Sequence, residues 1–165
     1  MATHTIPIIS QNMLPQSGAF FDRIGNQITA ANEIGNQLAL VLNDPGTDEG
    51  FYDSFRVPDN YVGTPKILMV GVLDGAMTTV TLGIGIKGLP LVDNEVADAA
   101  YSTEDIGNIT ADHADEDLVT VSITLSNLVP VAGDELFYYF FIDSNVTTFT
   151  GNVLVTGVYF QYADA

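Results

Sequence analysis

Two acidic segments carry the residues with the clearest capacity for chemistry, at 44–49 and at 112–117. Carboxylate oxygens are the ligands that Ca²⁺ and Mg²⁺ prefer, and a pair of carboxylates can hydrolyse a glycosidic bond. Neither segment has EF-hand spacing, and both fall where strands must be joined, so a solvated turn is the competing interpretation. Asp112, Asp115 and Asp117 are therefore only candidate ligands for Ca²⁺ or Mg²⁺, and we expect no other cofactor.

The histidines and hydroxyls form no catalytic pattern. A serine or threonine nucleophile needs a positioned base, and the only histidines are His4, near the terminus, and His113, within the second acidic segment. There is no cysteine and no Gly-x-Ser-x-Gly motif, and the glycines of 83–88 lie in a strand pattern rather than before a helix. We predict no catalytic residues and no enzymatic activity.

Tyrosines are the side chains on which a sugar ring could stack. The chain has seven tyrosines and no tryptophan. Tyr61, Tyr101 and Tyr159 are the candidate stacking residues of a carbohydrate-binding module. The alternative is that the tyrosines and phenylalanines are buried, since most of them fall in strongly apolar strands.

Charge limits the possible partners. Twenty-one acidic residues against four cations give a formal net charge of -17, which would repel a nucleic-acid backbone or an anionic membrane surface. Charged residues make up only 15% of the chain and apolar ones 47%, so much of the surface must be apolar or neutral. We expect association with copies of the chain or with a larger assembly, and neither a signal peptide nor a membrane span.

Alternation of apolar and polar residues with a period of two predicts an all-β fold. It is clearest at 119–125, and at 80–86, where Gly83 and Gly85 indicate close backbone approach or curvature and Lys87 is expected to point to water. Eight strands are predicted, at 19–23, 37–42, 51–57, 66–73, 80–86, 119–125, 136–143 and 153–162, and a weak ninth at 106–110. Short strands without βαβ spacing predict a single antiparallel β-sandwich of jelly-roll type.

The domain organisation predicted is an extended N-terminal arm at 1–18 and a jelly-roll domain at 19–165. Pro7 excludes the arm from a central strand, so the arm either lies on a neighbouring subunit or frays. Three strands, at 66–73, 136–143 and 153–162, are apolar on both faces, and one face of each could meet another subunit. The candidate contact residues are Ile6, Ile8, Ile9, Phe137, Tyr139, Phe141 and Tyr159.

Two segments resemble a known family: Phe55–Ile67, with its Val-Pro-Asp-Asn-Tyr-Val-Gly-Thr-Pro run, and the aromatic ending Gly157–Ala165. The chain resembles the jelly-roll capsid cement or decoration proteins of tailed bacteriophages, over roughly residues 51–165. The resemblance implies a homotrimer on the outer face of the capsid, bound to the major capsid protein. The chain departs from that pattern in lacking tryptophan and in its two-sided aromatic strand at 136–142, so no attachment surface is transferred.

The function predicted from the sequence is that of a non-enzymatic virion structural protein, a capsid cement or decoration protein. Another virion module of the tail, baseplate or head fibre is the first alternative. A carbohydrate-binding module for host recognition is the second. A carboxylate-dependent glycoside hydrolase is the least favoured.

Overall fold

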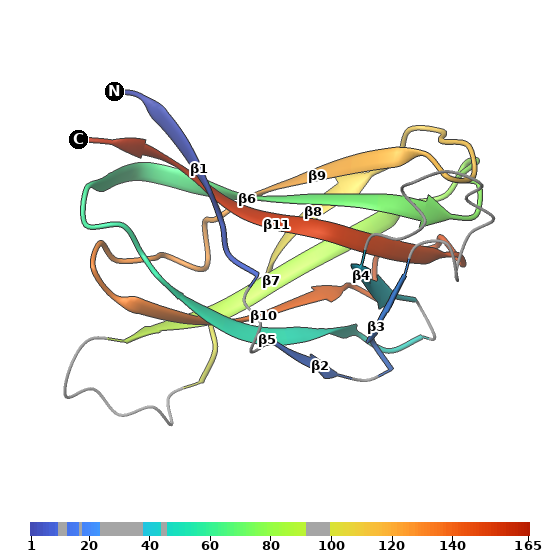
Figure 1. The fold of residues 1–165 in the computed structure, drawn as a ribbon, viewed down its shortest axis with the longest axis horizontal. Helices are drawn as coiled ribbons and strands as arrows, with labels where there is room; N and C mark the ends of the chain where they lie inside the picture. Colours follow the sequence, from blue (N-terminus) through green and yellow to red (C-terminus); the bar gives the residue numbers. More distant parts are fainter. Residues whose placement is uncertain (10–12, 17, 24–37, 44–45, 92–99) are drawn as a thin grey trace.

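The computed structural model is a sandwich of two antiparallel β-sheets (Figure 1). It describes residues 1–9, 13–16, 18–23, 38–43, 46–91 and 100–165. Sheet A contains, in spatial order, β3 (Phe20–Arg23), β4 (Leu38–Leu42), β11 (Asn152–Asp164), β6 (Tyr61–Asp74) and β9 (Leu118–Thr124), and β1 (Thr3–Pro7) also pairs with β11. Sheet B contains β2 (Leu14–Gln16), β5 (Glu49–Arg56), β10 (Glu135–Ile142), β7 (Leu82–Leu91) and β8 (Asp105–Ile109).

Strands β4 to β11 are connected as a jelly roll. Sheet A holds the order β4-β11-β6-β9 and sheet B the order β5-β10-β7-β8, so the chain crosses repeatedly between the sheets. The predicted all-β, jelly-roll sandwich is therefore confirmed. The weak ninth strand at 106–110 is also real, because it corresponds to β8.

Two strands at the N-terminus were not predicted. β1 contains Pro7 and pairs only with β11, and β2 is a three-residue edge strand that contains Pro15. Proline cannot donate to a β-ladder, so it is tolerated where one side of the strand has no partner. The prediction that Pro7 excludes a central strand was thus correct, but the two edge strands β1 and β2 were not predicted.

The core lies between the two sheets, and β10 shows how it is built. Leu136, Tyr138, Phe140 and Ile142 point into the core and are completely buried. Successive strand residues point to opposite faces, so Phe137, Tyr139 and Phe141 must face outward from sheet B. The two-sided apolar pattern of this strand therefore serves two different surfaces.

The N-terminal segment belongs to the same sandwich. The N–H of Ile8 donates to the carbonyl of Val158 at 2.9 Å, and the Tyr138 hydroxyl donates to the carbonyl of Ile8 at 2.8 Å. Asp164 accepts a hydrogen bond from the backbone N–H of Ala2, which, with a contact to His4, lowers the pKa of the Asp164 carboxyl. Both termini consequently lie at one end of the sandwich (Figure 1). None of the described residues form a helix long and apolar enough to cross a membrane.

Candidate functional site

The outer side of sheet B carries the largest group of aromatic side chains outside the core clusters. Strand register aligns Tyr52 of β5, Tyr139 of β10 and Lys87 of β7 in one row across the sheet. Phe137 and Phe141 lie two residues to either side on β10. We call the set Tyr52, Tyr101, Phe137, Tyr139 and Phe141 the aromatic face.

Four rings of the aromatic face form a continuous row. The rings of Tyr139 and Phe141 are stacked with centroids 4.9 Å apart and an interplanar angle of 12°. Tyr52 stacks on Tyr139 at 4.5 Å and 28°, and Tyr101 lies beside Tyr52 at 6.1 Å and 44°. Offset stacking at these distances stabilises each neighbour, so the row holds its shape without a ligand.

Exposure divides the aromatic face into a floor and a contact surface. Phe141 and Tyr139 are 0% and 5% exposed, so they form the floor. Tyr52, Tyr101 and Phe137 are 37%, 38% and 41% exposed. A grouped set of half-exposed aromatic rings is typical of a ligand-binding or interaction surface.

Two glycines provide the space in which the floor lies. A Cβ atom at Gly85 would stand 2.5 Å from Cζ of Phe141, whereas one at Gly50 would meet the backbone of β10 at the Phe140 carbonyl oxygen and at Cα of Phe141. The ring of Phe141 therefore lies against the backbone at Gly85, and Gly50 leaves room for the backbone that carries this ring. The close approach predicted for the glycines of β7 is confirmed at Gly85.

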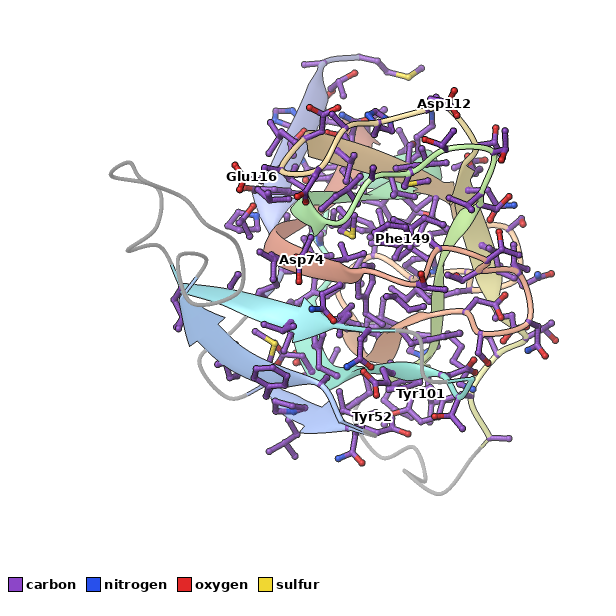
Figure 2. All side chains as sticks on the ribbon, turned by 90° about the vertical axis from the view of Figure 1, so that its right-hand side faces the viewer. Tyr52, Asp74, Tyr101, Asp112, Glu116 and Phe149 are labelled. Carbon is purple, nitrogen blue, oxygen red and sulfur yellow. The ribbon has the colours of Figure 1, made fainter. Side chains whose placement is uncertain are left out.

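Tyr101 is positioned by its neighbour Ser102. The Ser102 N–H donates to the Gly88 carbonyl at 2.8 Å, and the Gly88 N–H donates to the Ser102 hydroxyl at 3.2 Å. Burial, and secondarily the nearby Tyr52, raises the pKa of the Tyr101 phenol, so it remains a neutral hydrogen-bond donor at physiological pH. Figure 2 shows Tyr52 and Tyr101 close together at the sheet B side of the molecule.

Polar groups lie among the rings. Lys87 is half-buried, with its ammonium 5.5 Å from the centroid of Tyr139 and 5.3 Å from that of Phe141. Lys87 points outward from sheet B, as expected, but it is only partly exposed, because glycine at 85 lets the Phe141 ring lie beneath the lysine side chain. Ser54, opposite Phe137 in the β-ladder, is also half-buried on this side.

The acidic loop at 112–117 uses its carboxylates to bind backbone N–H groups, two in the connection between β6 and β7 and one in its own turn. Asp112 accepts from the N–H of Thr79, Asp115 from that of Gly75, and Asp117 from that of Ala114, at 3.0, 2.7 and 2.9 Å. Within the described ranges, no three His, Asp or Glu side chains are grouped so that they could hold a metal ion. The loop lies far from Tyr52 and Tyr101 (Figure 2).

The other predicted contact and stacking residues lie elsewhere. Tyr159 is on the outer side of sheet A, where it pairs with Leu68, and Tyr61 packs edge-on against the core ring of Phe160 at 6.0 Å. Ile8 is buried. Ile6 and Ile9 are partly buried against the core. The structure thus brings together Tyr101, Phe137, Tyr139 and Phe141, and separates them from the remaining candidates.

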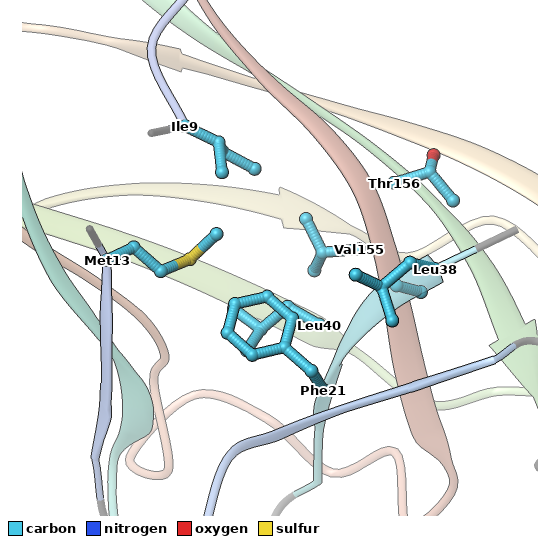
Figure 3. A pocket seen from close by; sticks show the side chains of 8 residues that line it. Ile9, Met13, Phe21, Leu38, Leu40, Val155 and Thr156 are labelled. Carbon is cyan, nitrogen blue, oxygen red and sulfur yellow. The ribbon is translucent and has the colours of Figure 1, made fainter. Parts of the chain in front are cut away.

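An apolar pocket of about 410 Å³ opens elsewhere on the molecule (Figure 3). The described residues that line it are Ile9, Met13, Phe21, Leu38, Ala39, Leu40, Val155 and Thr156. No charged side chain is among these residues, so the pocket offers little to orient a polar ligand. It is a weaker candidate than the aromatic face.

Tyr52 of the aromatic face and the adjacent Lys87 were missed as site residues. Alternation in 51–57 places Tyr52 on the side opposite the buried Phe51, so the sequence did carry a signal for Tyr52. The proximity of Tyr52 to Tyr139 comes from the pairing of β5 with β10, which one sequence does not reveal.

No model of a known protein family matches the chain, and neither does any curated protein. Xylanase 10B of Clostridium thermocellum, solved as CBM22-1 and GH10 modules complexed with xylohexaose, aligns with a TM-score of 0.51 and 11% identity over 98% of this chain and 28% of that one. Arabinose-bound MgGH51 α-L-arabinofuranosidase aligns with a TM-score of 0.50 and 12% identity over 94% of this chain and 24% of that one. The chain spans about a quarter of the length of these two proteins.

A third structure, the mannan-recognising carbohydrate-binding module TmCBM27, aligns at 13% identity over 99% of this chain and 99% of that one. Its TM-score of 0.44 is too low to support an argument. At such identities, the first two similarities show a shared β-sandwich fold and nothing more.

Proposed function

We propose that the chain is a non-catalytic carbohydrate-binding module whose ligand lies on the aromatic face of sheet B. The observation that carries the proposal is the pair of half-exposed rings, Tyr52 and Tyr101, which extend a stacked row onto the surface. This row continues into the buried floor of Tyr139 and Phe141, so its ring contacts exist without a ligand.

The chemistry of the face suits a sugar. One side of a pyranose ring presents C–H groups that pack on an aromatic ring, while its hydroxyls need hydrogen-bond partners. The phenols of Tyr52 and Tyr101 and the ammonium of Lys87 supply such partners beside the rings. Binding sites for small ligands are in general mainly apolar, with a few polar groups that orient the ligand.

The fold comparison supports the same class of ligand. Of the two structures described above with TM-scores of 0.50 and 0.51, one is complexed with xylohexaose and the other holds arabinose. Jelly-roll sandwiches serve many functions, so this similarity adds to the argument from the aromatic face and does not replace it.

The predictions of a virion location, a homotrimer and a major capsid protein as partner stay predictions. No feature of the described residues favours them over glycan binding. A module that binds host glycans would be compatible with a virion, but the proposal does not depend on that setting.

The test is glycan binding by the purified chain and by two variants, Tyr52→Ala and Tyr101→Ala. Wild type is first screened by affinity electrophoresis against soluble polysaccharides and on a glycan array, and positive ligands are then measured by titration calorimetry. Each substitution should weaken binding by at least about tenfold, because an exposed aromatic ring at the centre of a site is the usual energetic hot spot.

Tyr159→Ala is the matched control, since it removes a partly exposed tyrosine from the opposite sheet and should leave affinity unchanged. Circular dichroism and thermal unfolding would show that each variant is folded. Absence of binding across both screens would overturn the proposal, as would equal affinities for the wild type and for both face variants.

A further inference from the structure

Lys87 is the cation over the floor of the aromatic face. The chain has only four Lys and Arg residues against 21 acidic ones. Lys87 extends from β7 in the same row as Tyr139 and Tyr52, and its ammonium lies over the rings of the floor. One of the few positive charges in a strongly negative molecule is thus held where the proposed ligand would lie.

This ammonium has no carboxylate partner among the residues that the structure describes. The ion pairs found there join His4 to Asp164, Arg56 to Asp59, and His113 to Asp117. No hydrogen bond from Lys87 Nζ to a described residue occurs either. An ammonium has three N–H donors, and the aromatic rings attract its charge without satisfying those donors as an oxygen would.

A half-buried cation that has no anionic partner among the described residues is unusual in a chain with so many acids. Partial burial removes some of the ammonium's water, and an oxygen acceptor would restore the lost hydrogen bonds. A charged acceptor would do so best, because hydrogen bonds between two ionised groups are shorter and stronger than those to a neutral hydroxyl. The position is therefore better suited to an anionic group than to a sugar hydroxyl.

The charge of the whole molecule restricts what kind of anionic ligand can bind. A net charge of -17 repels a densely charged polyanion at long range. The same net charge opposes much less the binding of a glycan that is mostly neutral and carries isolated anionic groups. The reason is that single charges farther apart than about 8 Å are screened at physiological salt.

We propose that the ligand of the aromatic face is a sparsely charged glycan, in which a carboxylate or sulfate ester binds Lys87 while neighbouring sugar rings stack on Tyr52 and Tyr101. This inference rests on the proposed function and adds the chemical class of the ligand. It also assigns Lys87 as the residue that determines specificity.

The experiment compares wild type, Lys87→Gln and Lys66→Gln on an array that carries neutral, uronic-acid-bearing and sulfated glycans. Lys66 is the matched control, since it is an exposed lysine on β6 of sheet A. Wild type and Lys66→Gln should prefer glycans of one anionic class. Lys87→Gln should lose that preference, and the two anionic sets on the array distinguish a carboxylate from a sulfate.

Calorimetry on the best ligand then compares it with its carboxyl-reduced or desulfated form, which keeps the same backbone. We expect the anionic form to bind wild type about tenfold more tightly at low salt, and both forms to bind Lys87→Gln equally. Wild-type binding to neutral glycans only, or without discrimination, would overturn this inference and leave the proposed function intact. Lack of binding to any glycan would overturn both.

Discussion

Asp105 shows how much of this fold depends on a single buried carboxylate. It is 4% exposed at the start of β8 and accepts hydrogen bonds from the backbone N–H groups of Ser126, Asn127 and Leu128 and from the Ser126 hydroxyl. Its two oxygens therefore fix the first turn of the connection between β9 and β10. This connection leads directly into β10, the strand that carries Phe137, Tyr139 and Phe141.

We predict that Asp105→Asn destabilises the protein by on the order of 3 kcal/mol, measured as the free energy of unfolding in urea. An amide presents one oxygen and an NH₂ group, so some N–H donors of the turn would face another donor. Asp59→Asn is the control, since Asp59 is exposed and its sole ion pair among the described residues is a long, exposed contact of 3.7 Å with Arg56. The effect of this substitution should stay below about 0.5 kcal/mol. Equal effects of the two substitutions would contradict this account.

Single residues of the site were predictable to unequal degrees. Tyr101 was one of three tyrosines predicted as stacking residues, and Phe137, Tyr139 and Phe141 were predicted as subunit contacts from the two-sided pattern of their strand. The alternative interpretation, that the tyrosines and phenylalanines are buried in apolar strands, does not hold for Tyr52, Tyr101 and Phe137. Side-chain alternation gives the face on which a residue lies, but exposure depends on what the neighbouring strands contribute.

At the scale of elements, the floor of the aromatic face depends on the fit between β7 and β10. Gly85 and Phe141 are partners in the ladder, and the ring occupies the space that a side chain at 85 would need. We predict that Gly85→Ala destabilises the protein by about 1–3 kcal/mol, since the added methyl group must displace the ring or the backbone.

A double-mutant cycle measured by urea unfolding separates this clash from a general preference for glycine. Phe141→Leu removes the ring atoms nearest to position 85, so Gly85→Ala should cost clearly less in that background. The coupling free energy should exceed about 0.5 kcal/mol in favour of the double variant. Strictly additive effects would mean that the ring does not explain the glycine.

The elements themselves followed from sequence where alternation or apolar runs were strong. β9, β10 and β11 were predicted within two residues of their observed bounds, whereas β6 begins five residues earlier and β7 ends five residues later than predicted. β1 and β2 were missed because they are short, contain proline and depend on one partner strand. Their pairing is set by β11 and β5, which lie far away in the sequence.

For the whole molecule, the dominant property is the excess of negative charge. Seventeen uncompensated charges on a 17.6 kDa chain repel one another in the folded state more than in the expanded unfolded state. The sandwich must therefore derive its stability from its apolar core while electrostatics opposes folding. Screening by salt should relieve this opposition.

We predict that the melting temperature at pH 7 rises by at least about 3 °C between 10 and 150 mM NaCl, equivalent to ~1 kcal/mol. Most of the rise should occur in this range, because the Debye length falls there from about 30 Å to about 8 Å. Scanning calorimetry up to 1 M NaCl is the measurement, with light scattering at each salt concentration to detect self-association. An early rise followed by a plateau indicates screening. A flat response, or a rise that continues linearly to 1 M without the early component, would show that charge repulsion does not limit the stability of this sandwich.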